Sequence, residues 1–128
     1  MQLEKTTHYA VRILRYLHTN PGQQRPGSIA EAVGISSQLV TRLTAKLRRD
    51  NLVTFVPGRG GGYTLGRPAE EISFYDMFVA AEGEFCISHC FKEGLCNEDG
   101  HCKAHDYLMK MQEDWSNDMQ GVCLADLD

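Results

Sequence analysis

The stretch SIAEAVGISSQLVTRLTAKLRR, residues 28–49, decides the fold. Ser28 and Glu31 have the spacing of a capping box, which predicts the start of a short helix that ends at Gly34. Ser36 can cap the next helix, which is expected to run to about Arg49. Its buried face carries three apolar residues at helical spacing: Val40, Leu43 and Leu47. Two helices joined by so short a turn predict a helix-turn-helix, with the second helix as the recognition element.

The segments on either side extend this motif. Apolar residues at helical spacing predict a helix over 7–17, which must end before Asn20-Pro21-Gly22. After the motif, residues 52–56 and 63–65 favour β-strands, and the glycine-rich run 57–62 between them must form a turn or flexible loop. Ser73 can cap a fourth helix that reaches about Ala81, and a last helix follows Cys102. The predicted fold is mainly α with a small β-hairpin, a winged helix-turn-helix followed by a long C-terminal helix.

Charge is divided unevenly along the 128 residues. Residues 1–68 contain ten Lys and Arg against three Asp and Glu, whereas residues 69–128 contain three against fourteen. A basic first half in an acidic chain indicates that only the first half meets a polyanion. We therefore expect a DNA-binding domain over 1–68. Residues 69–128 hold the clustered cysteines and the last helix, and they are expected to form a cofactor-binding loop and a dimerisation helix.

The recognition helix presents polar side chains opposite its apolar stripe. Those suited to base edges are Gln38, Thr41 and Arg42. Those better placed for phosphates are Ser36, Ser37, Lys46, Arg48 and Arg49. Arg59 stands alone in the glycine run, from which it can enter a minor groove. Taken alone, the basic residues of this helix are more consistent with an ordinary solvated face than with DNA binding. Combined with the capped helices and the hairpin, they favour double-stranded DNA as the partner.

Four of the five cysteines fall within seventeen residues, and the N-terminus has no secretory signal. A cytoplasmic location is therefore expected, where clustered cysteines more often bind metal or act in redox chemistry than form disulfides. The pattern Cys-x5-Cys-x5-Cys-x2-His runs through Cys90, Cys96, Cys102 and His105. Its wide, even spacing favours an iron–sulfur cluster over a single ion. A zinc site, a thiol switch and unliganded cysteines remain alternatives.

Two cysteines fall outside this pattern. Cys86 precedes Cys90 by four residues and is interpreted as a spare or redox-active thiol. Cys123 lies in an apolar stretch and is expected to be buried. The helix after Cys102 carries one apolar stripe, formed by Leu108, Met111, Trp115 and Met119. Such a stripe, distant from the main core, is expected to pack against a second copy of the same helix in a homodimer.

The chain resembles the IscR/NsrR/RirA family of bacterial winged-helix regulators, the Rrf-two superfamily. Similar stretches include Tyr9-Ala10-Val11-Arg12 near the start and Leu124-Ala125-Asp126-Leu127 at the end. The most diagnostic stretch is the wing tip 60–66 with the segment 69–73 that follows it. The resemblance covers nearly the whole chain. One departure is Pro57, where relatives commonly have arginine; here the wing's positive charge lies at Arg59.

The resemblance implies a homodimeric transcriptional regulator whose operator affinity depends on an iron–sulfur cluster sensing iron, redox state or nitric oxide. The IscR branch implies a 2Fe–2S cluster held by Cys90, Cys96, Cys102 and His105. The NsrR branch implies a 4Fe–4S cluster that can take a carboxylate from the partner's first helix. This sequence has His8 at that position, so His8 is a rival fourth ligand. No nucleophile–base constellation supports an enzyme, and no apolar run is long enough to cross a membrane.

Overall fold

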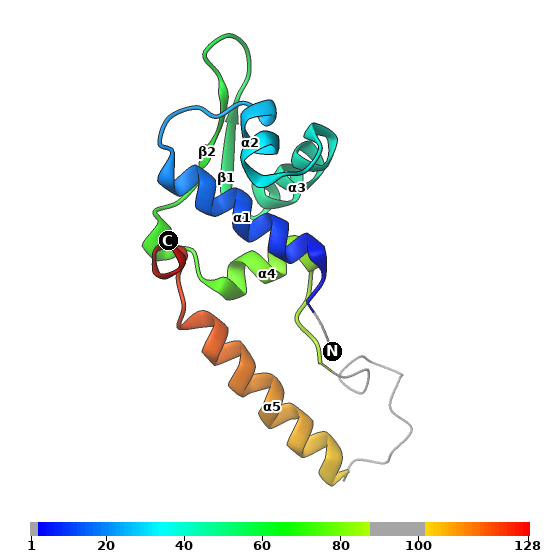
Figure 1. Cartoon of the computed structure of the whole chain (residues 1–128). Coiled ribbons are helices and arrows are strands. Elements are labelled where there is room, and N and C mark those ends of the chain that lie inside the picture. The colour runs from blue at the N-terminus through cyan, green and yellow to red at the C-terminus, as the bar shows by residue number, and fades with distance from the viewer. Residues whose placement is uncertain (1–2, 88–101) are drawn as a thin grey trace.

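The computed structural model describes residues 3–87 and 102–128, and it has a helical body with a projecting hairpin (Figure 1). Three helices form the N-terminal part: α1 (Lys5–Thr19), α2 (Pro26–Val33) and α3 (Ser37–Arg49). The hairpin follows as β1 (Val53–Val56) and β2 (Gly62–Leu65). Next come the short 3-10 turn η1 (Ala69–Glu71) and α4 (Phe74–Glu82). The chain ends with α5 (Lys103–Gln120) and the 3-10 turn η3 (Leu124–Leu127). The predicted fold class is confirmed.

The helix-turn-helix forms as the local signals predict, with one correction. The Ser36 hydroxyl accepts a hydrogen bond from the Leu39 N–H at 3.1 Å and caps α3. Gly34 ends α2 in the left-handed region at φ +81°, which glycine adopts without steric cost. The capping box predicted for α2 is wrong, because α2 begins at Pro26 and Ser28 lies inside it. Proline suits the first helical position, since its φ is already helical and its missing N–H needs no partner there.

The hairpin pairs β1 with β2 in antiparallel register, with Val53 opposite Leu65 and Val56 opposite Gly62. The linker before α2 also pairs with the hairpin through an isolated antiparallel bridge, in which Gln24 and Tyr63 exchange backbone hydrogen bonds of 3.0 and 2.8 Å. Gly62 has φ +149°, and a Cβ placed there would lie 2.6 Å from the Gln24 carbonyl oxygen. Glycine at this position therefore allows the linker to pack directly against the wing.

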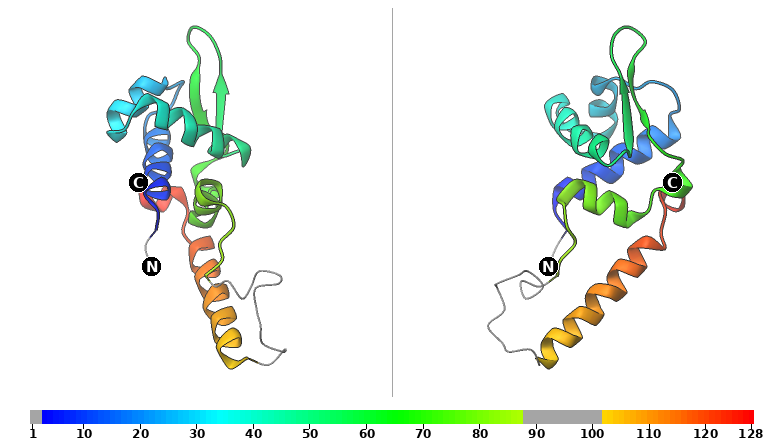
Figure 2. Two further views of the ribbon diagram at one scale, coloured as in Figure 1. Left: turned by 90° about the vertical axis from the view of Figure 1, so that its right-hand side faces the viewer. Right: turned by 180° about the vertical axis from the view of Figure 1, so that it is seen from behind.

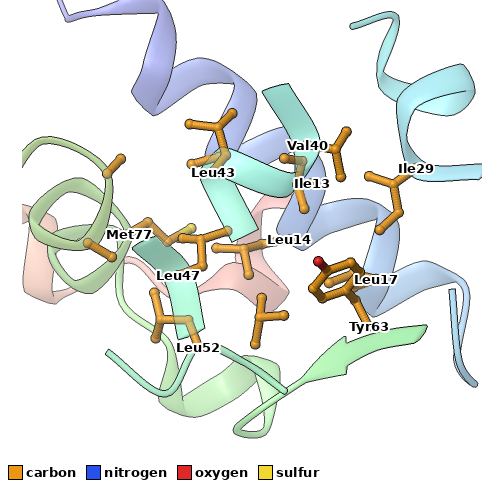
Figure 3. Packing of buried hydrophobic residues seen from close by; sticks show 14 of the residues in the cluster. Ile13, Leu14, Leu17, Ile29, Val40, Leu43, Leu47, Leu52, Tyr63 and Met77 are labelled. Atoms are coloured by element: carbon orange, nitrogen blue, oxygen red, sulfur yellow. The ribbon is translucent and has the colours of Figure 1, made fainter. Parts of the chain in front are cut away.

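One hydrophobic core holds α1, α2, α3, the hairpin and α4 together (Figure 3). Its fully buried side chains include Ile13, Leu14, Val40, Leu47 and Met77. The C-terminal turn belongs to the same core: Leu124 is fully buried, and its N–H donates to the Ile72 carbonyl at 2.8 Å. This cluster includes residues on both sides of position 68. The predicted boundary at residue 68 therefore separates two functions rather than two hydrophobic cores, and it stays a prediction.

Helix α5 extends from this body at the end opposite the hairpin (Figures 1 and 2). None of its 18 residues is buried within the chain. Among the described residues, no helix is both long and apolar enough to cross a membrane.

Candidate nucleic-acid interface and cysteine segment

Helix α3 presents most of the predicted DNA-binding side chains to solvent. The exposed ones are Ser36, Ser37, Gln38, Thr41, Arg42, Arg48 and Arg49. The Thr41 hydroxyl donates to the Ser37 carbonyl at 3.0 Å, so its methyl group is the part left for an apolar contact. Arg42 is the exposed cation among the residues predicted to read bases.

Two cations of α3, Lys46 and Arg48, also make contacts within the protein. The Lys46 ammonium lies 3.4 Å from the carbonyl oxygen of Ala81, in the last turn of α4. A cation stabilises the carbonyl end of a helix, so this contact attaches α3 to α4. The Arg48 guanidinium lies 5.4 Å from the centre of the Phe55 ring on the wing. Sequence reasoning assigned both residues to phosphates, and that assignment remains a prediction.

The wing tip carries exposed Arg59 between two glycines with positive φ, Gly58 at +89° and Gly60 at +75°. A second guanidinium reaches the tip from the linker, because Arg25 Nη2 donates to the Gly58 carbonyl at 3.5 Å. Sequence reasoning missed Arg25. The available signal was its place directly before Pro26, which predicts an extended residue at the start of a helix.

Within the described ranges, 3–87 and 102–128, Arg67 is the only lysine or arginine in an ion pair, with Asp76 at 3.5 Å. The lysines and arginines of α1, α3 and the wing therefore have no carboxylate partner in that part of the chain. Such an uncompensated basic surface attracts a polyanion.

The predicted metal ligands are only partly visible. Cys90 and Cys96 lie outside the described residues, whereas Cys102 and His105 are both half-buried at the start of α5. Cys102 is the N-cap of α5, and its carbonyl accepts the Asp106 N–H at 3.1 Å. Cys102 and His105 are three residues apart at this helix start, which places both on one side of it. One thiolate and one imidazole so placed fit half of a Cys3His ligand set.

The rival ligand His8 occupies another part of the molecule. It is exposed in the first turns of α1, where it borders a groove with Arg12 and Arg15. The beginnings of α1 and α5 are well separated in all three views (Figures 1 and 2). His8 and His105 of one chain are therefore not brought together, and a His8 contribution would have to come from a partner subunit.

An apolar groove of about 470 Å³ lies between α4 and α5. Its aromatic lining consists of Phe74, Phe78, Phe85 and Trp115. Trp115 stacks on Phe85 with ring centres 6.3 Å apart, yet 41% of Trp115 remains exposed. The other members of the predicted stripe, Leu108, Met111 and Met119, are half-buried. The thiol-bearing Cys86 also borders this groove.

Two polar links around the groove were not predicted. The Gln112 amide accepts the Ile87 N–H at 2.8 Å and donates to the Phe85 carbonyl, joining α5 to the segment after α4. The Glu82 carboxylate accepts the Glu4 N–H at 3.1 Å and the Thr7 hydroxyl, joining α4 to the start of α1. No local sequence signal marks such long-range pairs.

Comparisons with known proteins agree with this architecture. Residues 3–127 match the model of the Rrf2 family, described as iron-dependent transcriptional regulators. Protein aau3 of Rhizobium meliloti is 35% identical, over 99% of this chain and 84% of that protein. The HTH-type transcriptional regulator IscR of Serratia proteamaculans is 30% identical, over 99% and 79%. In fold, the chain is similar to CymR (YrzC), the global cysteine regulator of B. subtilis, with TM-score 0.82, 22% identity and coverage of 99% and 95%.

Proposed function

The chain belongs to the Rrf2 family of DNA-binding transcriptional regulators, and on that premise we propose that an iron–sulfur cluster controls its affinity for an operator. The cluster is 2Fe–2S, held by Cys90, Cys96, Cys102 and His105, in a homodimer that acts in the cytoplasm. The observation that carries the proposal is the pair Cys102 and His105 at the start of α5. Their soft thiolate and borderline imidazole suit iron in a cluster.

The position of this pair suits a sensor. The start of α5 lies at the end of the molecule opposite the wing (Figure 1). A bound cluster would supply a group that responds to iron supply, oxidants or nitric oxide. A change at the cluster would then have to be transmitted from the cysteine segment to the DNA-binding surface. The contacts of Gln112, Glu82 and Lys46 provide a continuous set of attachments from α5 through the end of α4 to α1 and α3.

The homodimer is supported by the exposed face of α5. An 18-residue helix with no buried residue is stabilised when a partner covers its apolar stripe. The groove beside Trp115 offers an apolar surface for such a partner. A dimer also matches DNA recognition, because helix-turn-helix proteins usually bind two half-sites.

Anaerobic purification with visible and Mössbauer spectroscopy tests the proposal. A 2Fe–2S protein is expected to be brown and to contain about two irons and two sulfides per subunit. Its DNA affinity should change when the cluster is removed by a chelator. A colourless protein with stoichiometric zinc, or with a reversible disulfide and no iron, would instead support a zinc or thiol switch.

The fourth ligand is tested by His105→Ala and His8→Ala, compared side by side. His105→Ala should leave the helical circular dichroism unchanged while altering the visible spectrum of the cluster. His8→Ala is the matched control and should leave that spectrum unchanged. The reverse pattern would assign the fourth ligand to His8 and contradict the ligand set proposed here.

A further inference from the structure

The linker before α2 is fixed on the wing by its own hydrogen bonds. Gln24 pairs with Tyr63 through the backbone, and its side-chain amide accepts the Tyr16 hydroxyl at 3.0 Å and donates to the Asn20 carbonyl at 3.2 Å. Gly62 leaves the space that this close approach needs. The position of the next residue, Arg25, is therefore determined by the fold, although Arg25 lies on the surface.

Arg25 is the N-cap of α2, with extended backbone at φ −78° and ψ 153°, and it makes no side-chain cap. Its guanidinium reaches the wing tip 33 residues further along the chain and donates from Nη2 to the Gly58 carbonyl at 3.5 Å. An arginine side chain has five N–H donors in a planar fork. One hydrogen bond to Gly58 leaves the remaining donors for another acceptor.

The surroundings of Arg25 favour an anion as that acceptor. Arg59 is exposed one residue after Gly58, so two guanidinium groups belong to the same wing tip. Within residues 3–87 and 102–128, neither of them forms an ion pair. Like charges on one wing tip repel each other, and DNA phosphates that neutralise them remove that cost. The wing tip also projects beyond the helices beside α2 and α3 (Figure 1), where DNA lying on α3 can reach it.

We propose that Arg25 is a DNA-contacting residue that binds a backbone phosphate at the flank of the operator while holding the wing tip through Gly58. This inference rests on DNA binding by the winged helix-turn-helix. It assigns to Arg25 a phosphate of its own, distinct from any contact of Arg59. A phosphate contact carries no sequence information, so Arg25 contributes affinity on every DNA sequence.

The experiment measures the dissociation constant as a function of salt concentration, on operator and on random duplex DNA. Each phosphate neutralised contributes about 0.9 to the slope of log K against log salt for B-DNA. Arg25→Gln is expected to weaken binding to both duplexes about tenfold and to reduce the slope by about one per subunit. Lys110→Gln is the matched control, because it removes one exposed positive charge from α5, far from the wing, and should change neither quantity.

A double variant separates a direct contact from a purely structural role. If Arg25 and Arg59 each bind a phosphate, the double variant that carries both Arg25→Gln and Arg59→Gln loses as much slope as the two single variants lose together. If Arg25 only positions Arg59, the double variant has the slope of Arg59→Gln alone, and the proposal is overturned. An unchanged slope for Arg25→Gln also overturns it. Failure of the wild-type chain to bind any DNA would instead contradict DNA binding itself.

Discussion

Arg42 and Arg49 carry the same charge on the same helix, yet they are expected to act on different parts of DNA. Both side chains are exposed, but Arg42 lies among the residues expected to face base edges, whereas Arg49 is the last residue of α3. Arg42→Ala should reduce discrimination between operator and random DNA by roughly 1–3 kcal/mol. Arg49→Ala should weaken binding to both DNAs about equally, since a phosphate contact is independent of sequence.

Competition binding with operator and random duplexes at one fixed salt concentration checks this division of roles. Wild-type protein provides the reference ratio of the two affinities. An equal loss of affinity on both duplexes for Arg42→Ala would show that Arg42 contacts phosphate rather than base edges. A selective loss for Arg49→Ala would show that the base-reading surface extends to the end of α3.

Single residues differ in how far the sequence predicts their roles. The Ser36 cap and the left-handed Gly34 follow from local backbone chemistry, and both are confirmed. The contact of Lys46 with Ala81 was not predicted, because the position of α4 beside α3 is a property of the tertiary fold. Arg25 was missed for the same reason, since its partner Gly58 is 33 residues away.

At the scale of elements, Gln112 is expected to hold α5 against the segment after α4. Its amide satisfies both the Ile87 N–H and the Phe85 carbonyl in a half-buried setting. Gln112→Leu keeps a similar volume but leaves both backbone groups without that partner. We expect a loss of about 1–3 kcal/mol in the free energy of unfolding, together with faster hydrogen exchange at the Ile87 amide.

Gln120→Leu is the matched control for this measurement. It makes the same chemical change at an exposed position in the last turn of α5, where a surface substitution usually stays within about 0.5 kcal/mol of wild type. Chemical denaturation of both variants gives the two free energies. Equal stabilities for the two variants would show that the Gln112 link does not hold α5 in solution.

The element order could be predicted from the sequence, and the exceptions have physical causes. Apolar spacing, caps and glycine turns are local signals, so α1, α3, α4 and the hairpin match their predicted positions. The start of α2 was misplaced, because Pro26 determines it more strongly than the Ser28–Glu31 pattern. The Gln24–Tyr63 pairing was not predicted, because a two-residue bridge leaves no periodic pattern.

At the scale of the whole molecule, the charge division has a spatial counterpart. The basic residues 1–68 include the hairpin, whereas α5 in the acidic part extends from the opposite end (Figure 1). The sequence predicts both this division and the ligand set, but the ligand set stays a prediction because Cys90 and Cys96 lie outside the described residues. The pairing of Cys102 with His105 is consistent with the predicted spacing, and the complete site remains a proposal.

Recognition of two half-sites would require the proposed assembly of two chains. Trp115 stacks on Phe85 beside the groove and keeps 41% of its surface exposed, so it can pack against both its own chain and a partner. A tryptophan carries about 150–250 Å² of surface that can be buried. A second copy covering the exposed part would therefore contribute roughly 1–3 kcal/mol from each tryptophan at about 25 cal/mol per Å². An aspartate in its place would bring an unpaired charge into that contact.

Trp115→Asp is therefore expected to give monomers that retain their helical circular dichroism but bind operator DNA at least tenfold more weakly. Light scattering coupled to size-exclusion chromatography measures the mass, and DNA titration of the same sample measures the affinity. Asn117→Asp is the control, because it adds the same charge at an exposed polar position of α5 and should leave the dimer intact. An intact Trp115→Asp dimer would show that the stripe packs only within its own chain. A monomeric variant with unchanged operator affinity would show that one winged helix is sufficient for recognition, so the two measurements separate assembly from DNA binding.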